Sequence, residues 1–352
     1  MKKIVSIILV FILLFSLSAC GSQPQEQAPD TVQDPETSAP ENNDTAPETA
    51  PAESTQIRIA SLKGPTSMGL VDLYNKADQN SLPYELIYEL DGAADEISPK
   101  LISGELDAAA IPANLAAVLY NKTEGNLVVA AINTLGVLYI LENGDSVHSV
   151  SDLKGRTIYT TGKGTTPEYA LDYVLKMNGI DPDTDVKIEF ASEATEVSSM
   201  LEKDVTGNAV AMLPQPYVTA VTVQNENLRI ALSMAEEWDK VSDDSKLVTG
   251  VLVFRKEFAD ENPNLVGTFL NDYSASIDYA NNDLDGAAAL IEQYGIVAKA
   301  PIAQKALPFC NITFLGGKDM KEALAGYLQT LFDKNPASVG GKLPEESFYY
   351  GA

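Results

Sequence analysis

The sequence predicts an α/β fold built as two similar lobes. From Ile57 onward, short β-rich segments alternate with segments of helical periodicity, which is typical of largely parallel sheets covered by helices. A strand, turn and helix pattern also recurs about 100 residues further along the chain. With 352 residues and 45% hydrophobic residues, the chain is long and apolar enough to bury a core in each lobe.

The elements follow from the spacing of apolar residues. Short segments rich in β-branched and aliphatic residues predict strands at 57–62, 84–90, 107–111, 127–132, 156–160, 186–190, 209–213, 228–232 and 248–254. Apolar residues near the helical period predict helices at 67–77, 168–177, 264–279, 284–294 and 318–332. After Arg255 the pattern is almost wholly helical.

Two pairs of segments carry the internal repeat. The plan of 57–67 returns in 157–167, and that of 107–114 returns in 208–215. The turns are 48 residues apart in the first half and 50 in the second, so both halves keep the same plan. In open α/β sheets ligands bind at the carboxyl ends of strands, so we expect two such edges to face each other across a cleft. The alternative is a set of ordinary turns with proline at the first helical position.

The N-terminus predicts export. Lys2 and Lys3 precede an apolar run at 4–17 and a small-residue segment, which is the layout of a signal peptide at 1–19. The run is shorter than the roughly 20 residues that span a membrane. The segment from Leu17 to Gly21 is similar to the lipobox of bacterial lipoproteins, in which Cys20 becomes the lipidated first residue. A plain cleaved signal with a chance cysteine is the alternative.

The segment 20–56 predicts a disordered tether behind the lipidated Cys20. Residues 21–56 contain six prolines and eight acidic residues but no Lys or Arg, so they cannot bury a core. Residues 57–352 keep a formal charge of −20 out of the −26 of the whole chain. This excess of acid disfavours nucleic acid as a partner.

Cysteine and histidine are too few for most metal chemistry. Cys20 and Cys310 are the only cysteines and His148 is the only histidine, which excludes a disulfide framework, a Cys-rich metal site and a multi-histidine centre. We therefore expect no metal and no cofactor. The location of His148 between polar residues predicts a surface position, and Cys310 is expected to be a buried thiol.

Several of these segments resemble a known family. Segments 57–67, 104–112, 152–158, 162–167 and 212–216 resemble the substrate-binding lipoproteins of ABC importers, of the nitrate, sulfonate, taurine and thiamine-precursor (NMT1-like) type. The resemblance covers nearly all of 57–352. It implies a type II, periplasmic-binding-protein-like clamp whose two lobes are joined by two connecting strands. Lobe 1 would comprise 57–140 plus 249–352 and lobe 2 would comprise 141–248, with the ligand cleft between them.

The resemblance also implies which residues bind the ligand. They are Gly64, Thr66, Ser67, Asp91, Pro112 and Asn114 in lobe 1, and Gly164, Thr165, Thr166, Gln215 and Tyr217 in lobe 2. Asn114 and Gln215 carry amides that both donate and accept hydrogen bonds.

Each of these assignments has a structural alternative. The four hydroxyl residues could instead be plain helix N-caps, and Tyr217 could be a core residue. Trp238 is expected to pack in the core, and Lys63 and Lys163 to lie in solvent.

The function implied by the resemblance is solute capture without chemistry. The chain would be a monomer, anchored to the cell membrane on its extracellular or periplasmic side, that delivers a small organic solute to permease and ATPase subunits. A sulfonate- or carboxylate-type anion is favoured as ligand, and a pyrimidine or thiamine precursor is the alternative. A surface sensor or adhesin, or an enzyme on the same fold, are the other functions left open.

Overall fold

The computed structural model describes residues 55–204, 207–242 and 245–352, which fall in one compact unit. The predicted signal peptide, Cys20 and all but the last two residues of the predicted tether lie outside the described residues. In the described part no helix is both long and apolar enough to cross a membrane.

The described residues form a six-stranded sheet, here called the first sheet, in the order β11-β4-β10-β3-β1-β2. The strands β1, β2 and β3 are parallel, whereas β10 is antiparallel to both of its neighbours, β3 and β4. The bounds are β1 Gln56–Leu62, β2 Glu85–Asp91, β3 Ala108–Pro112, β4 Leu127–Leu135, β10 Val248–Arg255 and β11 Ile312–Leu315.

The described residues also form a five-stranded sheet, called the second sheet, in the order β7-β6-β8-β5-β9. Here β6 is parallel to β7 and β8, and β5 is antiparallel to β8 and β9. The bounds are β5 Leu138–Asn143, β6 Thr157–Thr160, β7 Lys187–Phe190, β8 Ala209–Pro214 and β9 Leu228–Ser233.

The two sheets share one plan, which confirms the repeat read from the sequence. β1 and β6 hold equivalent places, as do β3 and β8, and an antiparallel strand, β10 or β5, lies next to β3 or β8 in each sheet. In the first sheet β11 is antiparallel to β4 as well. The expectation of largely parallel sheets is wrong in this respect, because these antiparallel strands make the pairings mixed. Residues 136 and 137 carry the chain from the first sheet to the second.

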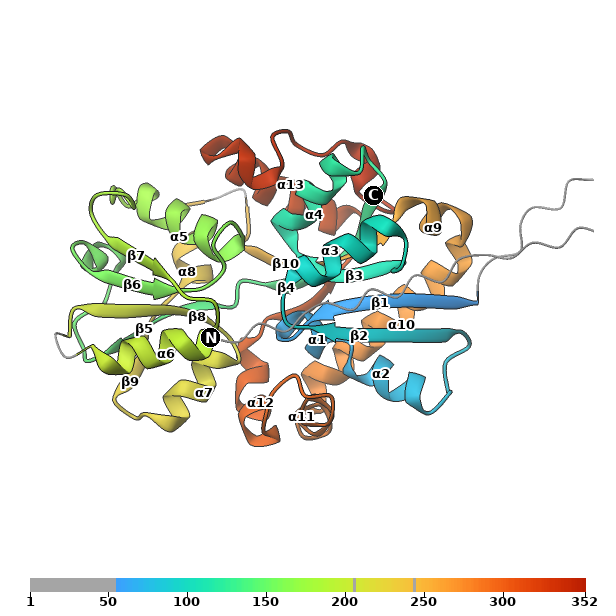
Figure 1. Cartoon of the computed structure of the whole chain (residues 1–352). Helices are drawn as coiled ribbons and strands as arrows, with labels where there is room; N and C mark the ends of the chain where they lie inside the picture. The colour runs from blue at the N-terminus through green and yellow to red at the C-terminus, as the bar shows by residue number, and fades with distance from the viewer. Residues whose placement is uncertain (1–54, 205–206, 243–244) are drawn as a thin grey trace, which may run out of the picture. The chain divides into compact units, whose positions relative to one another are not determined.

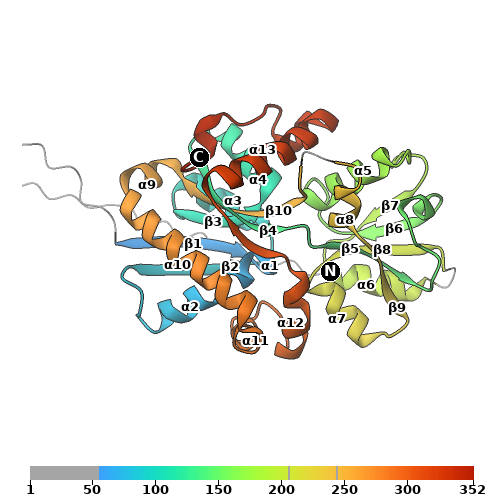
Figure 2. The same cartoon turned by 180° about the vertical axis from the view of Figure 1, so that it is seen from behind.

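Helices cover both faces of both sheets (Figure 1). In the first sheet, α3, α4 and α13 cover one face, and α1, α2 and α9 to α12 cover the other, as Figure 2 shows from behind. In the second sheet, α5 and α8 lie on one face and α6 and α7 on the other. The bounds are α1 Pro65–Met68, α2 Val71–Asp78, α3 Ala94–Ser103, α4 Ala113–Lys122, α5 Thr166–Met177, α6 Ala194–Lys203, α7 Tyr217–Gln224, α8 Met234–Asp239, α9 Lys256–Glu261, α10 Pro263–Asn282, α11 Leu284–Gln293, α12 Ala300–Ala306 and α13 Gly317–Lys334.

All nine predicted strands are present, and the differences lie elsewhere. β5 and β11 were not predicted. The helix predicted at 67–77 is two helices, α1 and α2, separated at Gly69. Gly69 packs so closely on α10 that a Cβ there would lie 2.8 Å from Ile277 Cγ1, so this point favours a glycine.

Candidate functional site

The predicted site residues of the first half follow strands that end at one edge of the first sheet. Leu62 at the end of β1 pairs with Asp91 at the end of β2. Pro112 at the end of β3 pairs with Gly250 near the start of the antiparallel β10, and Gly250 also pairs with Thr134. Helices α1 and α4 begin within a few residues of this edge, so their free N–H groups lie beside it.

The hydroxyls of Thr66 and Ser67 bond back to the strand that precedes them. Thr66 Oγ1 donates to the carbonyl of Leu62 at 2.9 Å, and Ser67 Oγ donates to the same carbonyl. Gly64 is the N-cap of α1, and no side chain caps this helix. The alternative of plain N-caps is therefore wrong for both residues, whose hydroxyls instead tie α1 to the end of β1.

Asn133 is a buried polar residue at this edge that the sequence analysis missed. A Cβ on Gly250 would lie 2.5 Å from Asn133 Oδ1 and 2.7 Å from Thr66 Cγ2, so these three residues are in contact. Asn133 is 1% exposed. Within the part of the chain that the structure describes, its Nδ2 and the neighbouring Thr249 Oγ1 have no hydrogen-bond partner. The only signal in the sequence was an amide directly after a run of apolar strand residues.

Asp91 is the acidic residue among the predicted site residues at this edge. Burial raises the pKa of its carboxyl and Glu96 adds to the rise, although Lys100, whose Nζ lies 3.8 Å from Oδ1, opposes it. Its Oδ2 is buried and has no hydrogen-bond partner among the described residues. Asp91 therefore keeps an acceptor that the surrounding described protein does not use.

The second sheet presents an equivalent edge. In the turn after β6, Gly162 and Gly164 both have a φ of 77°, a conformation that favours glycine. Thr165 is the N-cap of α5, but its Oγ1 donates to the Gly162 carbonyl at 2.7 Å rather than capping the helix. The Gly164 N–H donates to the Glu168 carboxylate. Thr165 thus holds the N-cap position that the alternative expected, but its hydroxyl does not cap the helix.

Gln215 follows β8 at this edge and is fully buried. Its Oε1 accepts hydrogen bonds from Thr219 Oγ1 at 2.8 Å and from the Thr219 N–H at 3.3 Å. Its Nε2 has no partner within the described residues, so one strong donor is left unused. The backbone N–H of Gln215 donates to Val137, which ties this edge to the segment joining the two sheets.

Asn114 and Thr166 are brought into direct contact although they lie in helices of different sheets. Thr166 Oγ1 donates to Asn114 Oδ1 at 3.2 Å, and both side chains are buried. Thr166 is the first residue of α5 and not its N-cap, so the capping alternative is wrong here too. Tyr217, in contrast, is 37% exposed, and burial raises the pKa of its hydroxyl.

A hollow of about 670 Å³ lies between α3 and α4. Most of its wall comes from these two helices, and Thr165 closes it from the second sheet. Its lining residues are Ala94, Asp95, Ser98, Pro99, Ile102, Ser103, Leu115, Leu119, Lys122 and Thr165. Of the predicted site residues, only Thr165 reaches it.

The other expectations about individual side chains are confirmed. Trp238 is fully buried, and its ring lies 4.3 Å from that of Tyr173 between centroids. Lys63 and Lys163 are exposed. Cys310 is fully buried, and burial raises the pKa of its thiol.

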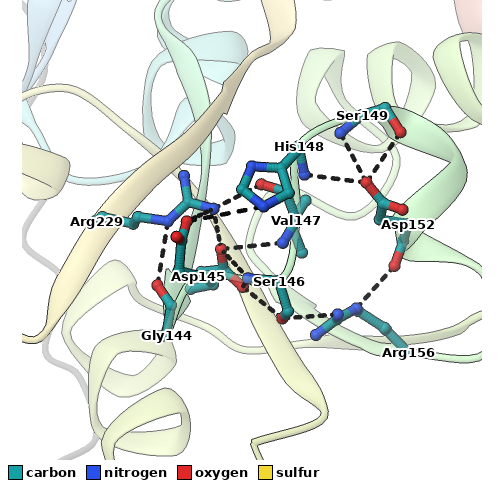
Figure 3. A network of polar contacts seen from close by, with 10 residues as sticks. Gly144, Asp145, Ser146, Val147, His148, Ser149, Asp152, Arg156 and Arg229 are labelled. Carbon is teal, nitrogen blue, oxygen red and sulfur yellow. Dashed lines mark hydrogen bonds and ion pairs between the residues drawn. The ribbon is translucent and has the colours of Figure 1, made fainter.

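His148 lies on the surface, at the rim of a polar network around the buried Glu142 (Figure 3). The Glu142 carboxylate accepts hydrogen bonds from the N–H groups of Ser146 and Val147 and from the guanidinium of Arg229. Burial alone would raise the pKa of Glu142, but these contacts outweigh it and lower that pKa. Because the carboxylate oxygens of Glu142 already accept these hydrogen bonds, the network stabilises the loop that contains Ser146 and Val147.

The chemistry available at the two edges is hydrogen bonding. Hydroxyls and amides dominate, with Asp91 as the charged exception. Among the described residues, no group of three or more His, Cys, Asp or Glu side chains is placed to hold a metal ion. The arrangement suits recognition of a polar solute by directed donors and acceptors.

Comparison with solved structures finds proteins of the same fold. The chain is similar to an ABC transporter structure from Parabacteroides distasonis, with a TM-score of 0.69, 23% identity and coverage of 84% of this chain and 99% of that one. The sulphonate-binding protein SsuA of Escherichia coli gives a TM-score of 0.66 at 15% identity, covering 83% and 93%. The nitrate-binding protein NrtA of Synechocystis PCC 6803 gives 0.59 at 11% identity, covering 84% and 83%. These likenesses concern the fold.

A comparison with curated protein sequences found no match. The model of the NMT1-like family matches residues 87–293, which is more than half of the chain. The matched range runs through both sheets, from β2 of the first through all of the second and back into β10. On this match, and with the fold that accompanies it, the chain belongs to the NMT1-like family.

Proposed function

We propose that this protein is the solute-binding component of an ABC importer and captures a small organic solute between two lobes. The observation that carries the proposal is the pairing of two equivalent sheet edges, each with polar side chains after β1 and β3 or after β6 and β8. Similarity to binding proteins for sulphonate and nitrate supports it. In this role the protein binds and releases its ligand unchanged, and separate permease and ATPase subunits move it across the membrane.

The lobes are proposed to be 57–140 plus 249–352 and 141–248. The first is built around the first sheet and the second around the second sheet, to which residues 138–140 at the start of β5 also belong. The proposed ligand-contact set keeps the predicted residues other than Asn114 and Thr166 and adds Asn133 and Thr249, whose unused polar atoms lie at the same edge. The set is Gly64, Thr66, Ser67, Asp91, Pro112, Asn133 and Thr249 on one side and Gly164, Thr165, Gln215 and Tyr217 on the other. Asn114 and Thr166 bond each other where the two sides meet and are left out of the set.

The ligand is proposed to carry oxygen acceptors, with a sulfonate or carboxylate favoured. Asn133 Nδ2 and Gln215 Nε2 are buried donors that lack a partner among the described residues. Such donors are costly to bury unless an acceptor reaches them. The N-termini of α4 and α5 add N–H groups that favour negative charge at the same edges. A pyrimidine carries similar acceptors and is the alternative ligand.

The protein is proposed to work at the outer side of the cell membrane as a monomer. Cys20 would carry the lipid, and the acidic, proline-rich residues after it would hold the binding unit away from the surface. Metabolic labelling of the expressed chain with a radioactive fatty acid tests this. Label in the wild type and none in Cys20→Ser is expected, and equal labelling of both would contradict it.

Thermal melting of the purified full chain against a panel of compounds tests the binding function. The panel comprises sulfonates, carboxylates, nitrate, pyrimidines and amino acids. A ligand at about 100 times its dissociation constant stabilises the folded state by roughly 2.7 kcal/mol, which gives a clear shift in Tm. A shift with one class, and recovery of that compound unchanged after incubation, is the expected result. A flat panel contradicts solute capture from these classes.

A further inference from the structure

A chain of hydrogen bonds links three helices across the two halves of the molecule. Tyr327 Oη on α13 donates to Thr166 Oγ1 on α5 at 3.3 Å, and Thr166 Oγ1 donates to Asn114 Oδ1 on α4 at 3.2 Å. The chain continues from Asn114 Nδ2 to the carbonyl of Ser338 at 3.2 Å. α4 and α13 pack on the first sheet and α5 on the second, so these bonds join the two sheets' layers.

This link is buried inside the hydrophobic core. Asn114, Thr166 and Tyr327 are 2%, 1% and 0% exposed. A single cluster of buried apolar residues runs from the first sheet through α13 to α5 and α8. In this buried setting a satisfied hydrogen-bond chain is strong, and an interrupted one is costly.

Trp238 lies against the same link. Its ring on α8 lies 4.3 Å from that of Tyr173 on α5 and 5.6 Å from that of Tyr327 on α13, measured between centroids. Trp238 Nε1 donates to Ser245 Oγ at 3.0 Å, and Thr330 on α13 donates to the same oxygen at 3.2 Å. The only tryptophan of the chain is therefore packed at the contact between α13 and the helices of the second sheet.

The polar atoms of this link are already paired with one another. Thr166 donates its only hydroxyl hydrogen to Asn114 and accepts from Tyr327, and the amide of Asn114 both accepts and donates. Gln215 differs, because its Nε2 has no partner among the described residues. Asn114 and Thr166 are thus equipped to hold the two halves together, whereas Gln215 keeps a donor for a ligand.

We propose that Asn114, Thr166 and Tyr327 form a closure clasp, which sets solute affinity by stabilising the closed arrangement of the two lobes rather than by binding the solute. This inference rests on the proposed function, in which the lobes separate and close by a hinge motion. The apparent affinity for a ligand that binds only the closed form is proportional to the fraction of protein in the closed form. The clasp residues raise that fraction without touching the ligand, so they act as positioning residues.

Intrinsic fluorescence of the free full-length protein tests the clasp without any ligand. The variants Tyr327→Phe and Thr166→Val each remove one hydroxyl, and Thr166→Ser keeps it. Tyr120→Phe is the matched control, because its hydroxyl bonds Ser347 on the first-sheet side only. Losing one hydrogen bond lowers the ratio of closed to open forms about fivefold. We expect acrylamide to quench Trp238 up to about fivefold more efficiently in Tyr327→Phe and Thr166→Val, with Thr166→Ser and Tyr120→Phe like the wild type.

Small-angle X-ray scattering distinguishes opening from local loosening. The double variant Tyr327→Phe with Thr166→Val is expected to have a larger radius of gyration than the wild type while circular dichroism shows it folded. More efficient quenching with an unchanged radius of gyration would mean local loosening and overturns the clasp, as does unchanged quenching.

The same panel of compounds separates the two proposals. If the clasp fails but solute capture holds, a stabilising compound compacts wild type and variants equally. If solute capture fails, the panel is flat whatever the scattering of the variants shows. If both hold, the compound returns the double variant to the wild-type radius of gyration at a higher concentration than the wild type needs.

Discussion

Gly250 and Asn133 lie so close that a single methyl group on Gly250 would come within 2.5 Å of Asn133 Oδ1. The same methyl would lie 2.7 Å from Thr66 Cγ2. The neighbours of Gly250 at this edge of the first sheet therefore leave no room for a side chain. This contact joins Gly250 on β10 to Asn133 on β4 and to Thr66 on α1. The proposed binding site requires these three elements to keep their positions relative to one another.

Gly250→Ala is therefore expected to disturb both stability and binding. Overpacking of this kind costs about 1–3 kcal/mol of folding free energy, and displacement of Asn133 and Thr66 removes solute affinity. Differential scanning fluorimetry with and without a panel compound measures both effects. Gly267→Ala on α10 is the control, since its Cβ would meet open space and the change raises helix propensity. Equal Tm and affinity in Gly250→Ala and the wild type would refute the close packing.

Removal of a proposed ligand contact should weaken binding without unfolding the protein. Gln215→Ala deletes the unused Nε2 donor, and Thr66→Val deletes a hydroxyl at the opposite edge. A loss of about fivefold in affinity is expected for each, which corresponds to one hydrogen bond of average strength. Isothermal titration with the stabilising compound gives the value. Gln329→Ala on the exposed face of α13 is the control, and unchanged affinity in both test variants would remove this cleft assignment.

Glu142→Gln should destabilise the protein, because the buried carboxylate accepts hydrogen bonds from Ser146, Val147 and Arg229. Loss of charge-assisted bonds of this kind costs about 2 kcal/mol. The folded pKa of Glu142 is lowered, so its stabilisation is present above the unfolded pKa and is lost as pH falls through the folded value.

Urea titrations at a series of pH values measure this effect of Glu142. The difference between wild type and Glu142→Gln should be full at pH 7 and shrink in acid, below the ordinary pKa of a glutamate. Glu202→Gln, at an exposed position, should match the wild type throughout. If the difference in unfolding free energy between the wild type and Glu142→Gln stays constant to the lowest pH measured, the charge of Glu142 does not contribute to stability.

Asp91→Asn should raise the Tm of the ligand-free protein at neutral pH. Burial raises the folded pKa of Asp91, so the folded state is favoured by protonation and loses stability as pH rises through that pKa. An amide of the same shape does not carry this cost. The gain should disappear below the unfolded pKa, and exposed Asp278→Asn should show no gain. A lower Tm for Asp91→Asn at pH 7 would show that the pair with Lys100 dominates instead.

Cys310 should be unreactive in the folded protein. Its Sγ donates to the Ala306 carbonyl at 3.3 Å, it is fully buried, and its raised pKa keeps it as a thiol. Thiolate is the reactive form, so a maleimide reagent should modify Cys310 only after unfolding. Mass spectrometry of a digest locates the label on the peptide that contains Cys310. Labelling at the same rate in buffer and in denaturant would contradict the burial.

The sequence predicted the strands well where turns separate them and less well where apolar segments run together. Between Leu127 and Leu141 only Asn133, Thr134 and Gly136 interrupt a long apolar run, so β4 was predicted to end at 132 and β5 was missed. β11 is four residues long and lies in a helical region, which hides its period. The number of parallel strand pairs was overestimated because β5 and β10 run opposite to their neighbours. Side-chain alternation along a strand is the same in both directions, so the sequence pattern does not reveal strand direction.

The site was predicted as a set of positions but not as a set of contacts. Strand ends and helix starts are visible in the sequence, and the structure places Thr66, Asn114, Thr166 and Gln215 at such points. The pairing of Asn114 with Thr166 joins residues 52 positions apart and depends on how two layers pack, which no local pattern records. Asn133 was missed because it lies within a strand that is otherwise apolar and buried.

The position of β10 determines the order in which this chain can be completed during synthesis. β10 lies between β3 and β4, so until residues 248–255 have been made β3 can pair only with β1 and β4 has no partner in the sheet. The second sheet uses only residues 138–233 and is complete earlier, although it comes later in the chain than β1 to β4. The edges of β3 and β4 that face β10 therefore stay open while the middle of the chain is made, so the sheet nearest the predicted export signal is completed after the second sheet.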